Sequence, residues 1–329
     1  MKQSLRDEYR ATLKSMDTEE TLDLMFYRPL GFAWAKLFAK LGVKPNAVTI
    51  ASIFLGVAGG VLLYYAQPEL RWLNYVGMLL IVWANSYDSA DGQLARMTGQ
   101  YSRLGRILDG LSGDFWFVTI YVALALREAT FGDFWPGDFF INHAWVIWTM
   151  AILSGLSHTK QAASADYYRQ FHLYILKGKN GSELDNAAQI RENYRNLPWK
   201  GNVWKKLTMF FYGLYTAGQE GNTPAMQRLR KAMHDNYGEE LPQSLRDAFR
   251  SRSLPLMKYT NMLTFNTRII AMFITVIINM PWLYFVIDIV VFNLMMIYMI
   301  VRHERACRIT LAELERGDYP PTPASETRS

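Results

Sequence analysis

Six apolar segments, each close to the length that crosses a lipid bilayer, constrain this chain more than any other feature. They lie at 48–66, 72–90, 107–126, 140–158, 260–280 and 282–301. A spanning helix needs about 20 predominantly apolar residues. Because lipid offers no partner for backbone polar groups, such segments fold as helices. We therefore expect an all-α, polytopic membrane protein with six transmembrane helices.

The polar residues of the chain are segregated from these spans. Half of the 329 residues are hydrophobic, yet the mean hydropathy is only −0.03. We expect an N-terminal arm with an interfacial helix, a block of four spans, a cytoplasmic helical insertion, two more spans and a cytoplasmic tail. The corresponding ranges are 1–46, 47–158, 159–258, 259–303 and 304–329.

Two segments outside the spans have the composition of membrane surfaces. Residues 21–41 place apolar side chains at near-helical spacing with basic residues between them, which predicts an amphipathic surface helix interrupted at Pro29. The insertion 159–258 carries 16 Lys and Arg against 9 Asp and Glu. Its positive charge is consistent either with attachment to anionic lipid or with binding of a phosphate or polar headgroup.

The charges of the short loops predict the orientation in the membrane. Loop 91–106 and the segment after residue 301 are rich in Arg, whereas loop 127–139 carries mostly acidic residues. Because cytoplasmic loops are enriched in basic residues, we expect both termini and loop 91–106 in the cytoplasm. The expected location is the cell (inner) membrane.

Four aspartates gather where two neighbouring spans meet. Asp88 and Asp91 end the second span, and Asp109 and Asp114 begin the third. A carboxylate at the bilayer centre costs about 2.5–3.5 kcal/mol, so such a cluster needs a stabilising partner. Residues three apart share a helix face. All-oxygen ligation without nearby His or Cys favours Mg²⁺ or Mn²⁺ over zinc.

Small residues and an arginine accompany these carboxylates. Gly92, Ala95 and Gly105 leave room for a ligand, and Arg96 offers donors to phosphate oxygens. Carboxylates, a divalent ion and Arg together indicate phosphoryl-transfer chemistry. The alternative, that the aspartates are helix caps and loop charges, explains one Asp per helix start but not a pair three residues apart.

The pattern Asp-x2-Asp-Gly-x2-Ala-Arg-x8-Gly-x3-Asp, from Asp88 to Asp109, resembles the signature of the CDP-alcohol phosphotransferase (CDP-alcohol phosphatidyltransferase) family. Pro45-Asn46 and Thr49, at the entry to the first span, form a second and weaker point of resemblance. The likeness covers 44–160 well and 258–305 loosely, and it excludes the insertion.

The resemblance implies specific roles for these residues. Asp88, Asp91 and Asp109 would bind two divalent ions, Gly92, Ala95 and Gly105 would shape the nucleotide site, and Arg96 would hold phosphate. The family's fourth aspartate, a metal-linked general base, would stand four residues after Asp109, where this chain has Gly113. A wide turn at Gly110 and Gly113 would return Asp114 to the cluster as metal ligand and base. In a regular helix, a water or His158 would replace it.

The expected activity is a transfer in phospholipid synthesis. A phospho-alkyl group would pass from CDP-diacylglycerol or a CDP-alcohol to a hydroxyl acceptor, such as an inositol phosphate, with release of CMP. The alternatives are a catalytically inactive nucleotide- or lipid-binding homologue and a cation transporter. We expect membrane lipid as a partner, a homodimer supported by Gly56, Gly59 and Gly60, and no binding of nucleic acid.

Overall fold

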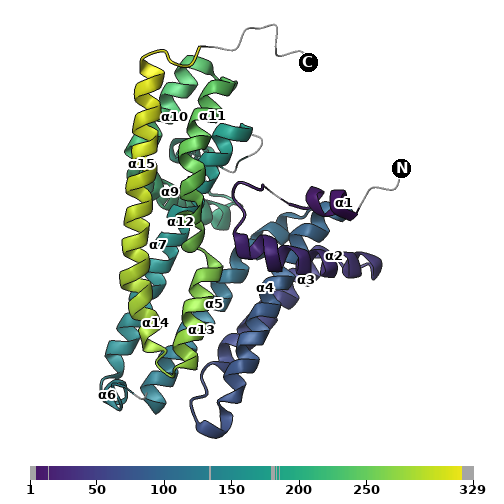
Figure 1. Ribbon diagram of the computed structural model, residues 1–329, viewed down its shortest axis with the longest axis vertical. Coiled ribbons are helices and arrows are strands. Elements are labelled where there is room, and N and C mark those ends of the chain that lie inside the picture. The colour runs from purple at the N-terminus through teal and green to yellow at the C-terminus, as the bar shows by residue number, and fades with distance from the viewer. Residues whose placement is uncertain are drawn as a thin grey trace. The chain divides into compact units, whose positions relative to one another are not determined.

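The computed structural model describes residues 5–13, 15–132, 135–178, 182, 184 and 186–320. Parts of four expected segments lie outside the described residues, namely 1–4 and 14 of the arm, 133–134 of loop 127–139, 179–181, 183 and 185 of the insertion, and 321–329 of the tail. Over the described ranges the chain is all-helical, without a strand (Figure 1). It divides into two compact units, Met1–Thr159 with Phe265–Phe292, and Lys160–Thr264 with Asn293–Ser329.

The first unit contains most of the expected spans. Its helices, in chain order, are α1 (Leu5–Ala11), α2 (Arg28–Lys40), α3 (Pro45–Leu62), α4 (Trp72–Thr98), α5 (Arg103–Phe131), α6 (Phe139–Asn142), the first part of α7 (Ala144–Lys177), α13 (Phe265–Ile277) and α14 (Trp282–Val286). Helix α3 packs against α4 and α5, and α2 packs against α4 (Figure 1). The apolar core contains Ile81, Ile120, Ile147 and Met272, which are buried.

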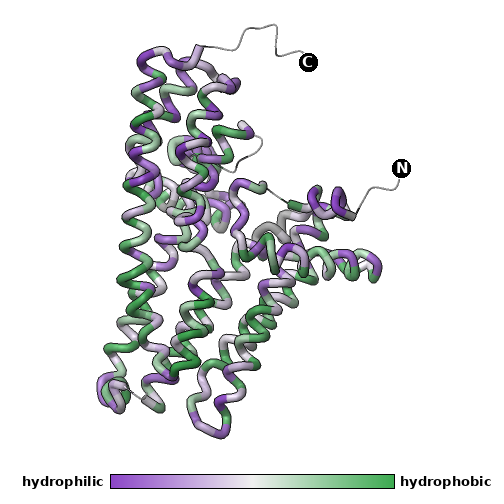
Figure 2. The backbone as a smooth tube through the Cα atoms, viewed as in Figure 1, coloured by the Kyte–Doolittle hydropathy of each residue, from purple (hydrophilic) through white to green (hydrophobic). Residues whose placement is uncertain are grey.

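Four helical stretches of the described residues are long and apolar enough to cross a membrane. They are Pro45–Leu62, Leu108–Phe131, Gln243–Ile277 and Trp282–Glu315. Figure 2 shows the last of these as apolar through the first half of α15 (Asn293–Glu315) and more polar toward its end. The expected span 72–90 lies within α4, and the expected span 140–158 begins in α6 and continues in α7. Neither α4 nor α7 is among the four. The structure therefore supports an integral membrane protein of at least four apolar helices.

The segment around Pro29 is continuous with the helix before it. Residues Asp23–Tyr27 form a π-helical turn, and the backbone N–H of Arg28 donates to the carbonyl of Asp23. Proline has no N–H and crowds the preceding turn of a helix. A π-helical turn absorbs such a local misfit without ending the helix. Pro29 therefore lies in the first turn of α2.

Glycines allow α3 to approach its neighbours closely. A Cβ on Gly59 would lie 2.7 Å from the carbonyl oxygen of Gly77 in α4, and a Cβ on Gly77 would lie 2.6 Å from that of Gly59. Gly56 faces the Trp116 ring, and Gly60 faces Ile120, both in α5. These glycines pack within one chain, so they give no support to the expected homodimer.

A buried polar network joins three elements of this unit. Asp288, in the π-helical turn Ile287–Phe292, pairs with Arg268 of α13, and both side chains are fully buried. Asp288 also accepts hydrogen bonds from Ser154 of α7 and from Tyr121 of α5, the latter at 3.1 Å. Buried charges in a membrane segment need such partners. The network therefore ties α5, α7 and α13 together.

The second unit is built around the end of the chain. It contains the remainder of α7, α8 (Ala187–Asn196), α9 (Val203–Gly221), α10 (Pro224–Tyr237), α11 (Gln243–Ser253), α12 (Met257–Met262) and α15. Helices α10 and α11 pack against α15 (Figure 1). Glu304 of α15 accepts from the backbone N–H groups of Ala225 and Met226 and so caps α10. The expected tail 304–329 thus begins inside a packed helix.

Candidate metal centre

The turn between α4 and α5 brings three of the predicted carboxylates together. Helix α4 ends at Gly99, whose positive φ of 68° closes the helix, and α5 begins after Ser102, which caps it by accepting from the Gly105 N–H. Each carboxylate of Asp88, Asp91 and Asp109 offers an oxygen, and these oxygens lie within 4.8 Å of one another. The carboxylates differ in burial, since Asp91 is buried, Asp88 is half-buried and Asp109 is exposed.

Two hydroxyl groups orient these carboxylates. Thr49 of α3 donates a hydrogen bond of 2.5 Å to Oδ2 of Asp91. Ser112 of α5 donates one of 2.7 Å to Oδ1 of Asp88. Loss of a group that orients a metal ligand typically lowers metal affinity by roughly 10–100-fold. The sequence pattern carries no signal for Ser112, and Thr49 appears in it only within the motif at the entry to the first span.

Burial and neighbouring charges raise the pKa of Asp91, which lies just beyond the expected span 72–90. Burial is the largest cause, Asp88 and Asp109 add to it, and the pKa rises from its ordinary value of 3.8 to about 8. A carboxylate in such surroundings is stabilised either by a proton or by a cation. The donor set consists of oxygens alone, which fits a hard divalent ion.

Arg96 lies beside the cluster with one free donor. Its Nε donates a hydrogen bond of 2.6 Å to the backbone carbonyl of Thr12. Its Nη2 is buried and has no hydrogen-bond partner among the described residues. This nitrogen would be 3.4 Å from a Cβ placed on Gly92. The Arg96 guanidinium therefore lies over Gly92, and Ala95, half-buried on the next turn, is also small.

Gly105 has a packing role for which the sequence motif carries no signal. A Cβ at this position would overlap Oδ1 of Asn46, at the start of α3. Asn46 in turn accepts a hydrogen bond of 2.8 Å from the Ser102 hydroxyl. Gly105 therefore lets the starts of α3 and α5 meet, and this contact sets the position of Asp109 four residues later.

Asp114 stands apart from the three-carboxylate group. Helix α5 is regular through Gly110 and Gly113, so the expected wide turn is not present in this structure. At about 100° per residue, Asp114 is turned about 140° around the helix from Asp109. Its side chain is exposed. A Cβ on Gly113 would meet no atom within 4 Å, so a larger residue fits there.

His158, the other candidate base, is engaged elsewhere. Its Nδ1 lies 3.1 Å from the Tyr121 hydroxyl, and its ring packs edge-on against Phe117. The histidine therefore belongs to the polar network around Asp288.

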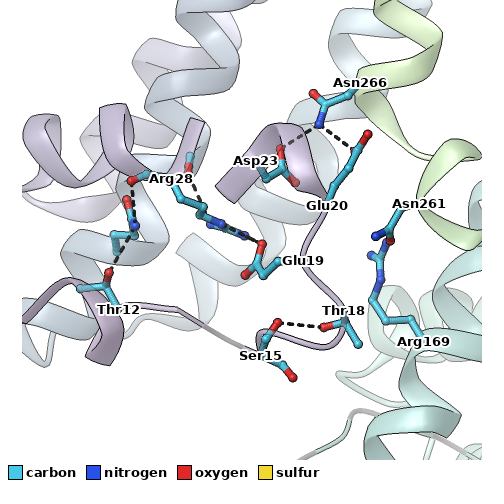
Figure 3. A network of polar contacts seen from close by, with 12 residues as sticks. Thr12, Ser15, Thr18, Glu19, Glu20, Asp23, Arg28, Arg169, Asn261 and Asn266 are labelled. Carbon is cyan, nitrogen blue, oxygen red and sulfur yellow. Dashed lines mark hydrogen bonds and ion pairs between the residues drawn. The ribbon is translucent and has the colours of Figure 1, made fainter. Parts of the chain in front are cut away.

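The N-terminal arm contacts α4 at residues other than the aspartates. Arg28 donates to Glu19 at 2.9 Å and to the Ser89 hydroxyl at 3.4 Å (Figure 3). Gln93 donates to the Thr12 hydroxyl and to the Arg28 carbonyl, both at 3.2 Å. Figure 3 also shows Glu20 and Asp23 around the amide of Asn266, at 2.7 and 2.8 Å. The residues between the motif aspartates thus hold the arm, a role with no signal in the motif itself.

The sequence around this site matches the model of a known protein family. Residues 43–168 match the family model described as CDP-alcohol phosphatidyltransferase. This segment belongs to the CDP-alcohol phosphatidyltransferase family. The match includes the motif from Asp88 to Asp109, so the resemblance that this motif indicated is confirmed. Family members are CDP-alcohol phosphotransferases and are known to use divalent metals.

Three curated proteins are similar over part of the chain. An uncharacterized protein of Aquifex aeolicus (strain VF5) is 32% identical over 108 residues, which is 33% of this chain and 52% of that protein. Choline/ethanolaminephosphotransferase 1 of Arabidopsis thaliana is 30% identical over 87 residues, 25% of this chain and 22% of the relative. Phosphatidylinositol phosphate synthase of Streptomyces avermitilis is 32% identical over 100 residues, 30% of this chain and 39% of the relative.

The matched region spans about half or less of each of these relatives. No solved structure matches the chain with significance.

Proposed function

We propose that this protein is a membrane-embedded transferase of phospholipid synthesis. It moves a phospho-alkyl group from a CDP-linked donor to a hydroxyl acceptor and releases CMP. The observation that carries the proposal is the convergence of Asp88, Asp91 and Asp109 within 4.8 Å, inside the segment of the CDP-alcohol phosphatidyltransferase family.

The three carboxylates would hold Mg²⁺ or Mn²⁺, with two ions expected from the family resemblance. Such ions, when bound, neutralise charge on the pyrophosphate. Thr49 and Ser112 hold the carboxylates of Asp91 and Asp88 in orientation. The buried Nη2 of Arg96 is available to a phosphate oxygen above Gly92. Ala95 and Gly105 complete the small-residue wall of the nucleotide site.

Asp114 is the general base that we propose for the acceptor hydroxyl. Its carboxylate is exposed and lies on α5, the helix that carries Asp109. Gly110 and Gly113 flank the intervening turn, and glycines adopt other conformations more readily than other residues do. A wider turn at these glycines in the substrate complex would bring Asp114 toward the cluster as a further metal ligand.

The acceptor that we propose is a polar or phosphorylated alcohol, with inositol phosphate as the first candidate. The support is the basic insertion 159–258, with 16 Lys and Arg against 9 Asp and Glu. One relative is a phosphatidylinositol phosphate synthase and another a choline/ethanolaminephosphotransferase. The donor is therefore either CDP-diacylglycerol or a CDP-alcohol.

The membrane arrangement that we propose has six spans, with α4 and α7 added to the four candidate helices. Residues 21–41 would lie on the membrane surface. Both termini and the carboxylate cluster would face the cytoplasm of the cell (inner) membrane, and two copies would associate through their spans. The proposal keeps the five segments expected from the sequence, namely the arm 1–46, the spans 47–158, the insertion 159–258, the spans 259–303 and the tail 304–329.

A catalytically inactive homologue is the competing function. Gly113 in place of the family's fourth aspartate, together with the regular helix at Asp114, favours it. Purified protein in detergent separates the two functions. We expect CMP release when Mn²⁺, CDP-diacylglycerol and inositol phosphate are supplied together. Bound but uncleaved CDP-diacylglycerol, across a panel of acceptors and a CDP-alcohol donor, would instead identify the inactive homologue.

A further inference from the structure

Helix α9 of the insertion exposes a continuous apolar face. Val203, Leu207, Phe210 and Leu214 follow one another at intervals of four, three and four residues, so they lie on one side of the helix. Their exposed fractions are 57%, 42%, 46% and 57%. We call these four residues the α9 stripe. Trp199, just before the helix, is also exposed, at 57%.

The flank of α9 next to the stripe carries its packing. Lys206 and Thr216 are buried, and Gly213 lies against Ile190 of α8. The ammonium of Lys206 sits over the rings of Tyr194 and Trp199, at 4.8 and 4.7 Å from their centroids. These cation–π contacts hold Trp199 near the start of the stripe. Phe210 also packs against Tyr194 of α8, with ring centroids 6.2 Å apart. The stripe therefore borders the contact with α8, and each of its four side chains is still more than 40% exposed.

The surroundings of the stripe are strongly basic. Between residues 187 and 216 the chain has five basic residues and one acidic residue. Four of the basic side chains, Arg191, Arg195, Lys200 and Lys205, are exposed. An exposed apolar face with aromatic rings and neighbouring cations is typical of helices that lie in the interface of anionic membranes.

We propose that the α9 stripe docks on the surface of an anionic lipid bilayer. Helix α9 is not among the segments apolar enough to span a membrane, so it would lie in the interface plane with the stripe and Trp199 toward the acyl chains. The basic side chains would contact lipid phosphates. A second copy of this chain fits the stripe less well, because two surfaces of the same positive sign repel each other.

This docking does not depend on the transferase activity, and it explains an insertion that the family segment 43–168 largely excludes. The chain already carries four candidate membrane helices. Tethering of this kind raises the effective concentration of the bilayer near α9, so even a weak affinity of the stripe for lipid keeps it bound.

Site-directed spin labelling tests the proposal on the full-length protein. Cys307 is the sole cysteine and is fully buried, so a new exposed cysteine can be labelled selectively with Cys307 either retained or replaced by serine. Phe210→Cys places the label on the stripe. Tyr212→Cys is the matched control, because this residue is 43% exposed and lies about 200° around the helix from position 210.

Accessibility to oxygen and to a water-soluble nickel complex is measured in nanodiscs of equal parts phosphatidylcholine and phosphatidylglycerol. We expect the ratio of oxygen to nickel accessibility to be several-fold higher at position 210 than at 212, and the difference to shrink in pure phosphatidylcholine. Equal ratios at both positions in the anionic nanodiscs would overturn the proposal. Dipolar broadening between labels at position 210 would also overturn it, since it would show that a second copy covers the stripe.

Discussion

The Thr49 hydroxyl donates a hydrogen bond of 2.5 Å to the Asp91 carboxylate and so links α3 to the carboxylate cluster. Both side chains are buried. We expect Thr49→Val, which keeps the shape and removes the donor, to weaken divalent-ion binding by roughly 10–100-fold, as loss of a ligand-orienting group does. The half-saturating Mn²⁺ concentration for CMP release measures this. Thr49→Ser should restore it, and an unchanged value in Thr49→Val would show that the hydroxyl has only a packing role.

The displaced aspartate can be tested by moving it back. If Asp114 is the base, Asp114→Ala should lower the rate of CMP release by roughly 10²–10⁴-fold. Nucleotide binding should change less. Because a side chain at position 113 meets no neighbour, adding Gly113→Asp to Asp114→Ala should restore much of the rate from the family's own position. A fully active Asp114→Ala enzyme would refute the assignment of the base.

The raised pKa of Asp91, about 8, predicts a pH dependence. Because the folded-state pKa lies above the ordinary 3.8, the protonated form favours folding. In metal-free protein this stabilisation is fully present below pH 3.8, declines as pH rises between the two pKa values and is lost above about 8. We expect the melting temperature in EDTA to fall as pH rises from about 5 to about 8 and then to level off, and added Mg²⁺ to restore it most at the upper end. Asp91→Asn should lack this component, and an equal pH response in wild type and variant would contradict the prediction.

The crossing of α3 and α4 at Gly59 predicts a stability effect. Gly59→Ala places a methyl group against the Gly77 carbonyl, and such overpacking costs about 1–3 kcal/mol. Gly110→Ala is the matched control within a helix, because nothing lies within 4 Å of its added Cβ. We expect a lower thermal midpoint in detergent for Gly59→Ala and an unchanged or higher one for Gly110→Ala. Equal midpoints would mean that the crossing adjusts freely.

Much of the carboxylate cluster was predictable from local spacing. Asp88 and Asp91 are three residues apart on one helix, and a short turn returns the chain so that Asp109 meets them. These relations depend only on helix periodicity and chain connectivity. The all-helical class follows in the same way from the length of the apolar segments.

The partners of these residues were not predictable from spacing. Thr49 reaches Asp91, and Thr12 holds Arg96, only because α3 and the arm adopt particular rotations against α4. The Arg268–Asp288 pair joins residues on two different elements. Gly110 and Gly113 permit either a wide or a regular turn, and the regular one is present because nothing in the sequence excludes it. Helix α4 is not among the four helices that are apolar enough to span a membrane, since it contains polar residues such as Asn74 and Asn85.

The most direct test of the metal centre measures bound Mn²⁺ and CMP release on the same samples of wild type, Asp91→Asn and Asp109→Asn. The amide keeps the shape of the side chain and removes the charge that holds a divalent ion. We predict that both variants remain folded and membrane-inserted, lose bound Mn²⁺ in electron paramagnetic resonance spectra and lose turnover. Near-normal Mn²⁺ binding and turnover in either variant would contradict the assignment of these carboxylates as metal ligands.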